Sequence, residues 1–221
     1  MDQQTETGNT TENGDGLSFN QSLETISGLD KETVEYALNH GVDANEICDD
    51  HVDSPSALHL FSRVTSDVNI IETLIAHGAN VNAVDNFNRS ALMMASYNNP
   101  GVAFCLMNSG ANVKQADDNG WHPMHWFAAN CEHQEVISLL VSAGADVNHI
   151  NNRGMTPLGT CLLSGVCPEV LTTLLNRGAG LTPKMLGAID VYIGLAEEKG
   201  RTPEVVERFK KHYKDGKIRS S

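Results

Sequence analysis

The chain has 221 residues with a formal net charge of −13 at pH 7, and 40% of its residues are hydrophobic. This charge argues against a general nucleic-acid binder, which needs a basic surface, and it disfavours adsorption to anionic lipid. No apolar run reaches the roughly 20 residues of a membrane-spanning helix, so we expect neither nucleic acid nor a membrane as partner. The 5 cysteines are irregularly spaced, which argues against a disulfide framework and indicates a reducing compartment, the cytoplasm or the nucleus.

The N-terminal residues 1–17 are acidic and rich in Thr, Asn and Gly, and we predict a disordered tail. They contain neither the basic nor the apolar region of a signal peptide. Residues 1–53 carry 13 acidic side chains and a single basic one, Lys31. Two interpretations of this charge stay open, because it can keep the chain soluble or steer a basic partner.

Residues 18–53 are interpreted as an N-terminal capping half-repeat with a first hairpin. Ser18 and Gln21 form the pattern of a capping box, which starts a helix. Asp30 is the expected N-cap of a second helix, which carries Val34 and Leu38 and ends at Gly41.

A sequence repeat fills the middle of the chain. Gly-Ala recurs at steps of 32, 34 and 34 residues, and a tetrapeptide similar to Thr-Pro-Leu-His recurs in phase with it. A first-position Ser or Thr can cap a helix, Pro suits the first helical residue, and Gly suits the left-handed position that ends a helix. The stretch after each Gly is rich in Asn, Asp and Gly, which predicts a hairpin. The glycine pairs are Gly78-Ala79, Gly110-Ala111, Gly144-Ala145 and Gly178-Ala179, and the tetrapeptides begin at Ser56, Ser90, His122 and Thr156.

This pattern resembles the ankyrin repeat, whose period is about 33 residues. The resemblance implies an all-α solenoid of helix-turn-helix units with projecting β-hairpin loops, with about four full repeats at residues 54–180. Three positions depart from the family's pattern. Met93 and Gly159 replace a buried His, so we expect those repeats to lose a polar contact. Phe127 replaces a small Ala, so we expect wider helix packing there.

Beyond Gly178 the hairpin pattern is missing, and Thr182-Pro183 and Thr202-Pro203 each predict the start of a helix. We assign residues 181–216 to C-terminal capping helices, because a solenoid needs polar caps, and residues 217–221 to a tail. The last helix has an apolar stripe that either docks onto the fourth repeat or binds a partner. The stripe consists of Val206, Phe209 and Tyr213.

One group of residues has the composition of a metal site, namely His122, His125, Cys131 and His133. The repeat explains His125 as its own buried histidine, His122 as the residue in the cap position, and His133 as a common start of the second helix. Cys131 and His133 are two residues apart, so they do not face each other as nucleophile and base. No phosphate-binding loop or nucleophile motif is present. We therefore predict no metal, no cofactor and no catalytic residue, and expect that the protein is not an enzyme.

The resemblance implies that a partner binds along the hairpin tips and the exposed side of the first helices. The repeat frame puts both tryptophans on that face in the third repeat. The alternative is core packing, which is a weak explanation for Trp121 in a hairpin tip and a stronger one for Trp126. Exposed aromatic, Met and Arg side chains are typical of binding hot spots. The predicted partner-binding residues are Phe87, Arg89, Met94, Tyr97, Asn119, Trp121, Trp126, Arg153 and Met155.

The sequence favours a non-catalytic module that recruits or masks a partner protein through the concave groove, and we expect a capped solenoid to be a monomer. Alternatives are a stoichiometric inhibitor of a kinase or a transcription factor, a substrate adaptor or accessory subunit of an enzyme complex, and a pathogen effector. Fold does not imply function, so the partner's identity does not follow.

Asn82 and Asn148 occupy the hairpin position that the family's asparaginyl hydroxylase can target. The structural alternative, which we favour, is a hydrogen bond from each Asn to the hairpin backbone.

Overall fold

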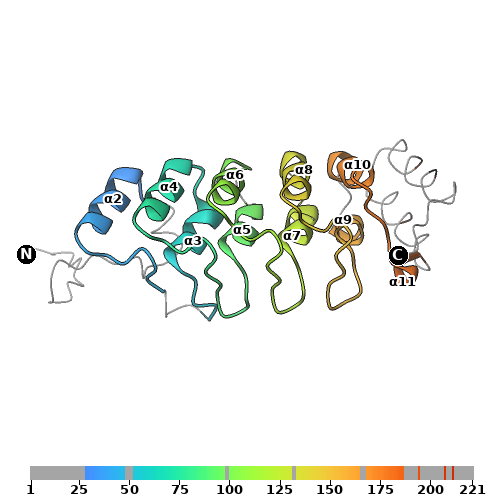
Figure 1. Cartoon of the computed structure of the whole chain (residues 1–221), viewed down its shortest axis with the longest axis horizontal. Coiled ribbons are helices and arrows are strands. Elements are labelled where there is room, and N and C mark those ends of the chain that lie inside the picture. Colours follow the sequence, from blue (N-terminus) through green and yellow to red (C-terminus); the bar gives the residue numbers. More distant parts are fainter. Residues whose placement is uncertain are drawn as a thin grey trace, which may run out of the picture.

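The computed structural model describes residues 28–47, 52–97, 100–130, 133–164 and 168–186, together with Gly194, Glu207 and Lys211. Within these residues, pairs of helices stand side by side in a row, and long loops project from one edge of the row (Figure 1). The predicted all-α solenoid is therefore confirmed.

In each pair the first helix lies next to the loops and the second lies at the opposite edge (Figure 1). Helix α2 (Lys31–Asn39) precedes the row, and the short α11 (Pro183–Leu186) follows it. The first helices are α3 (Ala57–Val64), α5 (Ala91–Met94) continued by the 3-10 turn η1 (Ala95–Tyr97), α7 (Pro123–Asn130) and α9 (Pro157–Ser164). The second helices are α4 (Val68–Ala76), α6 (Pro100–Asn108), α8 (Gln134–Ser142) and α10 (Pro168–Asn176).

The predicted caps start the helices. The Asp30 carboxylate accepts a hydrogen bond from the Thr33 backbone N–H at 2.9 Å, and the Ser90 and Thr156 hydroxyls accept bonds from residues three positions on, at 3.4 and 3.3 Å. Each bond satisfies a backbone donor that the first turn of a helix leaves free. Where His122 stands in the cap position, its backbone N–H donates instead to Nδ1 of His125 at 3.3 Å.

The predicted glycines end the helices. After α4, Gly78 has φ +92°, its N–H donates to the Ile75 carbonyl at 3.0 Å, and the Ala79 N–H donates to the Leu74 carbonyl at 3.0 Å. This pair of bonds is the Schellman arrangement, which favours glycine because the left-handed conformation strains any residue with a Cβ. Similar φ values, from +84° to +96°, occur at Gly41, Gly110, Gly144 and Gly178.

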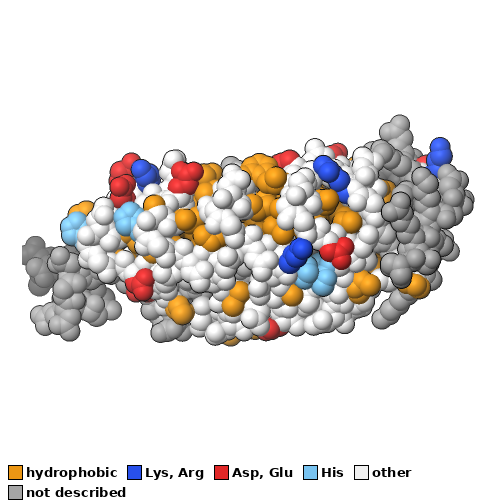
Figure 2. Space-filling view, viewed as in Figure 1, with side chains coloured by type: hydrophobic (Ala, Val, Ile, Leu, Met, Phe, Trp, Pro, Cys, Tyr) orange, Lys and Arg blue, Asp and Glu red, His pale blue; other side chains and the backbone are white. Residues whose placement is uncertain are grey.

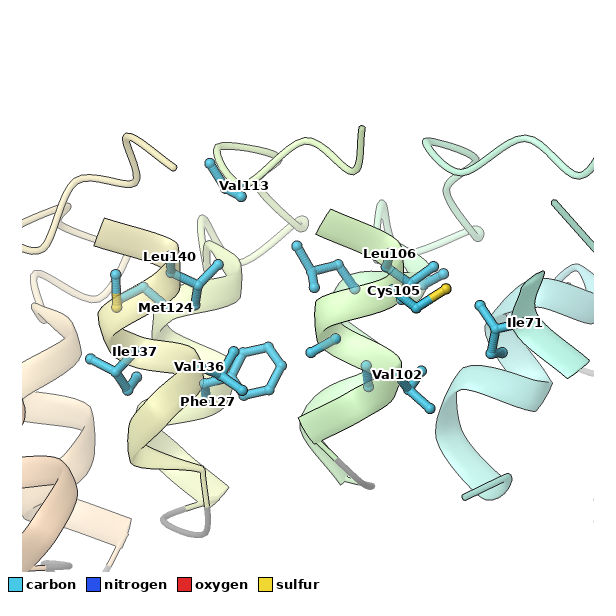
Figure 3. Packing of buried hydrophobic residues seen from close by; sticks show 14 of the residues in the cluster. Ile71, Val102, Cys105, Leu106, Val113, Met124, Phe127, Val136, Ile137 and Leu140 are labelled. Carbon is cyan, nitrogen blue, oxygen red and sulfur yellow. The ribbon is translucent and has the colours of Figure 1, made fainter. Parts of the chain in front are cut away.

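A continuous core runs along the row between the two layers of helices. Leu92 and Leu106 in one pair and Met124 and Leu140 in the next have no exposed surface. Figure 3 shows Leu106, Met124 and Leu140 among the packed side chains. Phe127 is also fully buried, so its ring is accommodated within the stack. Hydrophobic side chains also gather on the surface over α6 and α8 (Figure 2). Those that pack partly buried against the core there include Phe104, Met107 and Val141.

The two residues that replace the buried histidine, Met93 and Gly159, differ in how the space at that position is filled. Met93 is fully buried at its position. At Gly159, an added Cβ would lie 1.6 Å from Cε of Met185. Met185 comes from α11 and is itself only 3% exposed. The space left by the missing side chain is therefore filled by a methionine from the following helix.

The loops are hairpin-like, but the described part of the chain contains no β-strand and only two isolated bridges, Ile47 with Ser56 and Val84 with Ser90. Neighbouring loops are joined through their backbones, since Asp118 N–H donates to the Phe87 carbonyl at 3.1 Å and Asn152 N–H donates to the Asn119 carbonyl at 3.0 Å. The loops thus form a cross-linked row, like the helices behind them.

Helix α11 begins at Pro183, directly after Thr182, as the cap pattern predicted, and the Thr182 hydroxyl accepts a hydrogen bond from Met185 N–H at 3.3 Å. Several predictions lie outside the described residues, among them the tails at 1–17 and 217–221, the capping box at Ser18, the helix start at Thr202-Pro203 and the apolar stripe near Phe209. No helix in the described ranges is long and apolar enough to cross a membrane.

Candidate functional site

Three aromatic side chains from two neighbouring units meet on the side of the first helices. Tyr97 ends η1, Trp121 ends the loop before α7, and Trp126 follows on α7 itself. The ring centroids of Tyr97 and Trp126 are 5.9 Å apart with planes at 71°, and those of Trp121 and Trp126 are 5.8 Å apart at 66°. Such edge-to-face contacts are favourable for aromatic pairs. We call Tyr97, Trp121 and Trp126 the aromatic cluster.

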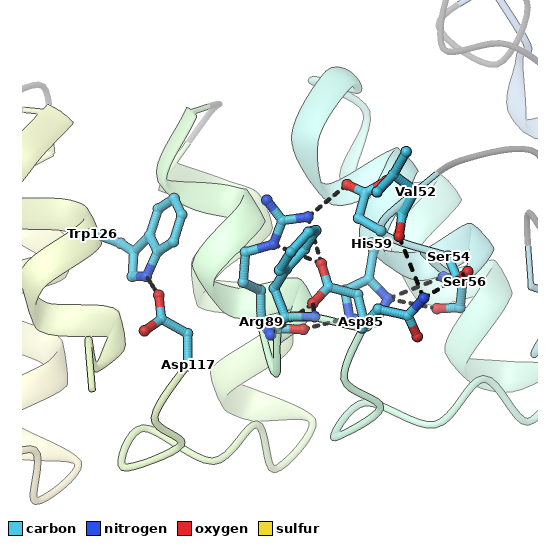
Figure 4. A network of polar contacts seen from close by, with 11 residues as sticks. Val52, Ser54, Ser56, His59, Asp85, Arg89, Asp117 and Trp126 are labelled. Carbon is cyan, nitrogen blue, oxygen red and sulfur yellow. Dashed lines mark hydrogen bonds and ion pairs between the residues drawn. The ribbon is translucent and has the colours of Figure 1, made fainter. Parts of the chain in front are cut away.

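A buried carboxylate, that of Asp117, holds both tryptophans in place. Its Oδ1 accepts hydrogen bonds from the backbone N–H groups of Asn119 and Trp121, at 2.8 and 2.9 Å. Its Oδ2 accepts the indole N–H of Trp126 at 3.2 Å (Figure 4). Sequence reasoning missed Asp117. The available signal was the recurrence of Asp or Asn four residues before the position of Trp121, at Asp85 and Asn151.

Two arginines lie against exposed aromatic rings, Arg63 on Tyr97 of the following unit and Arg89 on Phe87 of its own loop. The Arg63 guanidinium carbon is 5.6 Å from the centroid of the Tyr97 ring, and that of Arg89 is 5.1 Å from the Phe87 ring. Both distances fall within the range of cation–π attraction.

Arg89 also takes part in an ion-pair network. Its Nη2 lies 2.5 Å from Oδ2 of Asp53, and its Nε donates to Oδ2 of Asp85 at 2.6 Å (Figure 4). Partial burial opposes the charged form, but the two carboxylates outweigh it and raise the pKa of Arg89. The charge of Arg89, a predicted partner-binding residue, is therefore paired within the molecule, where it links one loop to the next.

The prediction that the Met94 side chain is exposed is wrong. Met94 is only 4% exposed, and the residues at the same repeat position, Leu60 and Thr160, are 4% and 2% exposed. The first helices stand side by side (Figure 1), so a residue at this position is covered within the stack. Trp126, at the same position, keeps part of its surface exposed.

The remaining predicted residues are spread along the loops. Phe87, Asn119 and Arg153 are exposed, and Met155 is partly buried. Each loop tip after the first contacts its neighbour through the backbone, with Phe87 and Asn119 supplying the carbonyls. The structure therefore brings together Tyr97, Trp121 and Trp126, whereas Phe87 pairs with Arg89 in a separate contact.

A family comparison accounts for the repeated unit. The model described as ankyrin repeats (3 copies) matches residues 24–117 and again residues 92–185, which together span more than half of the chain. The chain belongs to the ankyrin-repeat family. A search of the curated proteins found no match. Ankyrin repeats are generally protein–protein interaction modules, and the family is typically non-catalytic.

The histidine group lies within this ankyrin framework. Nε2 of His125 lies 3.1 Å from the Met155 carbonyl of the next repeat, as the buried histidine of the repeat should. The ring of His122 stacks on that of His149, with centroids 3.4 Å apart and planes at 10°. Burial lowers the pKa of His125 to about 4, and burial with the nearby His149 lowers that of His122 to about 4. Both rings are therefore neutral at pH 7.

His133 is the buried N-cap residue of α8, as the repeat predicted, whereas Cys131 lies outside the described residues. In the ranges that the structure describes, no three His, Cys, Asp or Glu side chains are grouped so that they could hold a metal ion.

The loop asparagines join adjacent ankyrin repeats. The Asn82 side chain donates to the Gly110 carbonyl at 3.2 Å and accepts from Asn112 N–H at 2.8 Å. Asn148 forms the same two bonds with Gly180 N–H and the Gly178 carbonyl, at 2.7 and 3.1 Å. This agrees with the structural interpretation of both residues.

Proposed function

We propose that this ankyrin-repeat protein is a non-catalytic module that recruits or masks a partner protein, and that the aromatic cluster is the centre of its binding surface. The observation that carries the proposal is that both tryptophans of the chain lie with Tyr97, 52% exposed, on the side of the first helices. Trp and Tyr are the residue types most enriched at binding hot spots.

The cluster is also held in position before any partner arrives. Asp117 fixes the backbone of Trp121 and the indole of Trp126, and each ring contacts its neighbour. Side chains that are already ordered lose little conformational entropy on binding. Aromatic rings that are held rigidly at the surface support a role in recognition, and such a role involves no catalysis.

Stoichiometric inhibition of a partner with a basic surface is a second candidate. It is favoured by the 13 acidic side chains among residues 1–53, which would attract such a partner over a distance. A role as substrate adaptor or effector would use the same surface. We propose a cytoplasmic or nuclear location, on the irregular cysteine spacing noted above.

The test compares three forms of the full chain in affinity capture from the native lysate, with identification by mass spectrometry. The forms are wild type, the double variant Trp121→Ala/Trp126→Ala, and the control Tyr36→Ala. Tyr36 is 54% exposed on α2, comparable to Tyr97, but lies outside the cluster. We expect a protein captured by wild type and by the control to be lost from the double variant, with circular dichroism showing that all three fold. Identical captures from all three forms would refute the proposal.

A further inference from the structure

We propose that the aromatic cluster seats the cationic side chain of a lysine or arginine of the partner. This inference rests on the proposed function, because it names the chemistry that the same surface recognises.

The shape of the cluster is the first argument. The planes of Tyr97 and Trp121 meet the plane of Trp126 at 71° and 66°, so the rings form the walls of a corner rather than a flat stack. A corner of aromatic faces is the arrangement that recognises alkylated ammonium groups, because several ring faces can lie within about 6 Å of one charge.

The electrostatics of the cluster favour a cation. The face of an indole is the strongest aromatic partner for a positive charge. The indole of Trp126 donates its N–H to the carboxylate of Asp117, and polarisation along such a bond increases the electron density of the ring. Asp118, the next residue, is exposed. The adjacent His125, 5.8 Å from Trp121, is neutral at pH 7, so it does not oppose a cation. Arg63 already lies over the Tyr97 ring, so the partner's cation is expected at the two indoles.

The same side of the molecule already holds cations on aromatic rings. Arg63 lies over Tyr97 and Arg89 over Phe87. Among the described residues, no guanidinium or ammonium lies over Trp121 or Trp126. The two rings best suited to a cation are thus the two that the described chain leaves without one, and a partner's basic side chain would complete the series.

The test uses the two indole N–H signals of the ¹H–¹⁵N spectrum, since the protein has 2 tryptophans and both belong to the cluster. The probes are N-acetyl-arginine amide and N-acetyl-citrulline amide, which share one shape and differ in charge. We expect the arginine probe to shift both signals saturably. We expect the citrulline probe to bind roughly two- to fivefold more weakly, the ratio that an exposed cation–π contact supports.

Matched variants distinguish the contribution of the aromatic rings to probe binding from that of the chain's net negative charge. Trp121→Leu removes a ring that carries no cation, without changing charge, and should weaken arginine binding, followed on the Trp126 signal, roughly two- to fivefold, whereas Tyr36→Leu should leave it unchanged. Asp117→Asn should reduce the preference for arginine over citrulline, because it removes the carboxylate that accepts the Trp126 indole N–H while leaving the rings in place. Asn151 in the corresponding position of the next repeat accepts from Arg153 and Met155 N–H groups, so an asparagine supports this turn.

Three results would overturn the inference: no shift with either probe, equal affinity for arginine and citrulline, or equal binding by the Trp121→Leu and wild-type proteins. None of them bears on the affinity capture described above. A partner that needs the tryptophans while the cluster shows no preference for charge would therefore support the proposed function and refute this inference alone.

Discussion

At the scale of single residues, Gly159 and Met185 show how a missing side chain lets the following helix pack against the fourth repeat. Gly159 stands where the first and third repeats have His59 and His125, and the Met185 side chain from α11 occupies the space beside it. Glycine inside a helix costs about 1 kcal/mol relative to alanine, so α9 gives up local stability. Burial of a methionine, which contributes about 1.5–3 kcal/mol, offsets this cost.

The effect of Gly159→Ala on the free energy of unfolding should therefore have opposite signs with Met185 present and with Met185 replaced by alanine. In the wild type we expect the added Cβ to displace Met185 and lower the free energy of unfolding by about 1–3 kcal/mol. In a Met185→Ala background the same change should raise it by about 0.5–1 kcal/mol, because only the helix propensity remains. Urea unfolding of the four proteins measures this double-mutant cycle. The same sign in both backgrounds would contradict the packing of Met185 against residue 159.

Two histidines with lowered pKa values, one buried and one half-buried, predict a loss of stability in mild acid. His122 and His125 have pKa values lowered from 6.5 to about 4 in the folded protein. The unfolded chain therefore binds more protons between these values, and stability falls as pH drops from about 6.5 to about 4. We expect a loss on the order of 3 kcal/mol from His125 and less from the half-exposed His122.

This dependence can be measured by urea unfolding at pH 7.5, 6 and 4.5. His122→Thr restores the usual cap residue and should reduce the slope of stability against pH. A stability that stays constant over this range would show that the two rings are not buried as neutral groups.

At the scale of the loops, amide side chains join one repeat to the next. Asn45 donates to the Gly78 carbonyl at 3.0 Å and accepts from Asn80 N–H at 2.7 Å, as Asn82 and Asn148 do in their repeats. The third loop has Lys114 at this position. Its local turn is the same, since Lys114 N–H donates to Asn112 Oδ1 at 3.0 Å and Asn82 N–H donates to Asn80 Oδ1 at 3.0 Å. The series of bridges is interrupted there because lysine has no amide group.

Lys114→Asn should complete the series. We expect the free energy of unfolding to rise by about 0.5–1.5 kcal/mol, the net contribution of a hydrogen bond in a site whose backbone is already in position. Thermal and urea unfolding measure the gain. Gln115→Asn, one residue along the same loop, serves as the control and should not stabilise. A neutral or destabilising Lys114→Asn would mean that the bridges at the other repeats contribute little.

At the scale of the whole molecule, the chain is a linear stack in which each repeat is stabilised by its neighbours. The core has no centre, because buried residues run along the full row from Val34 to Met185. Stability in such an array is a sum of repeat terms and nearest-neighbour terms. A defect in the middle of the row therefore affects cooperativity as well as stability.

Phe127→Ala creates such a defect. Its ring is fully buried on α7, and its removal should cost about 3–5 kcal/mol. Because the two halves of the stack would then be weakly coupled, we expect a broadened or two-step urea transition followed by circular dichroism. The control Leu163→Ala removes a side chain that is 44% exposed and should change stability by about 0.5 kcal/mol or less. A sharp single transition in Phe127→Ala would argue against nearest-neighbour coupling at this point.

The sequence by itself determined the period, the helix starts at Asp30, Ser90 and Thr156, and the left-handed glycines that end the helices. These features are local, because a cap or a helix end depends on residues within three or four positions and on backbone conformation. A repeat multiplies each local signal, so the family and the all-α solenoid could both be predicted.

The tertiary structure alone decided which side chains of the candidate surface are available. Met94 and Trp126 share one repeat position, yet Met94 is covered by the stack while Trp126 remains partly exposed beside Tyr97. Two further contacts could not be predicted from the sequence pattern. One is the hydrogen bond from the Trp126 indole to Asp117, nine residues away, and the other is the packing of Met185 beside Gly159. The first joins a loop to the helix that follows it, and the second joins α9 to α11, so each is set by the particular side chains that meet there.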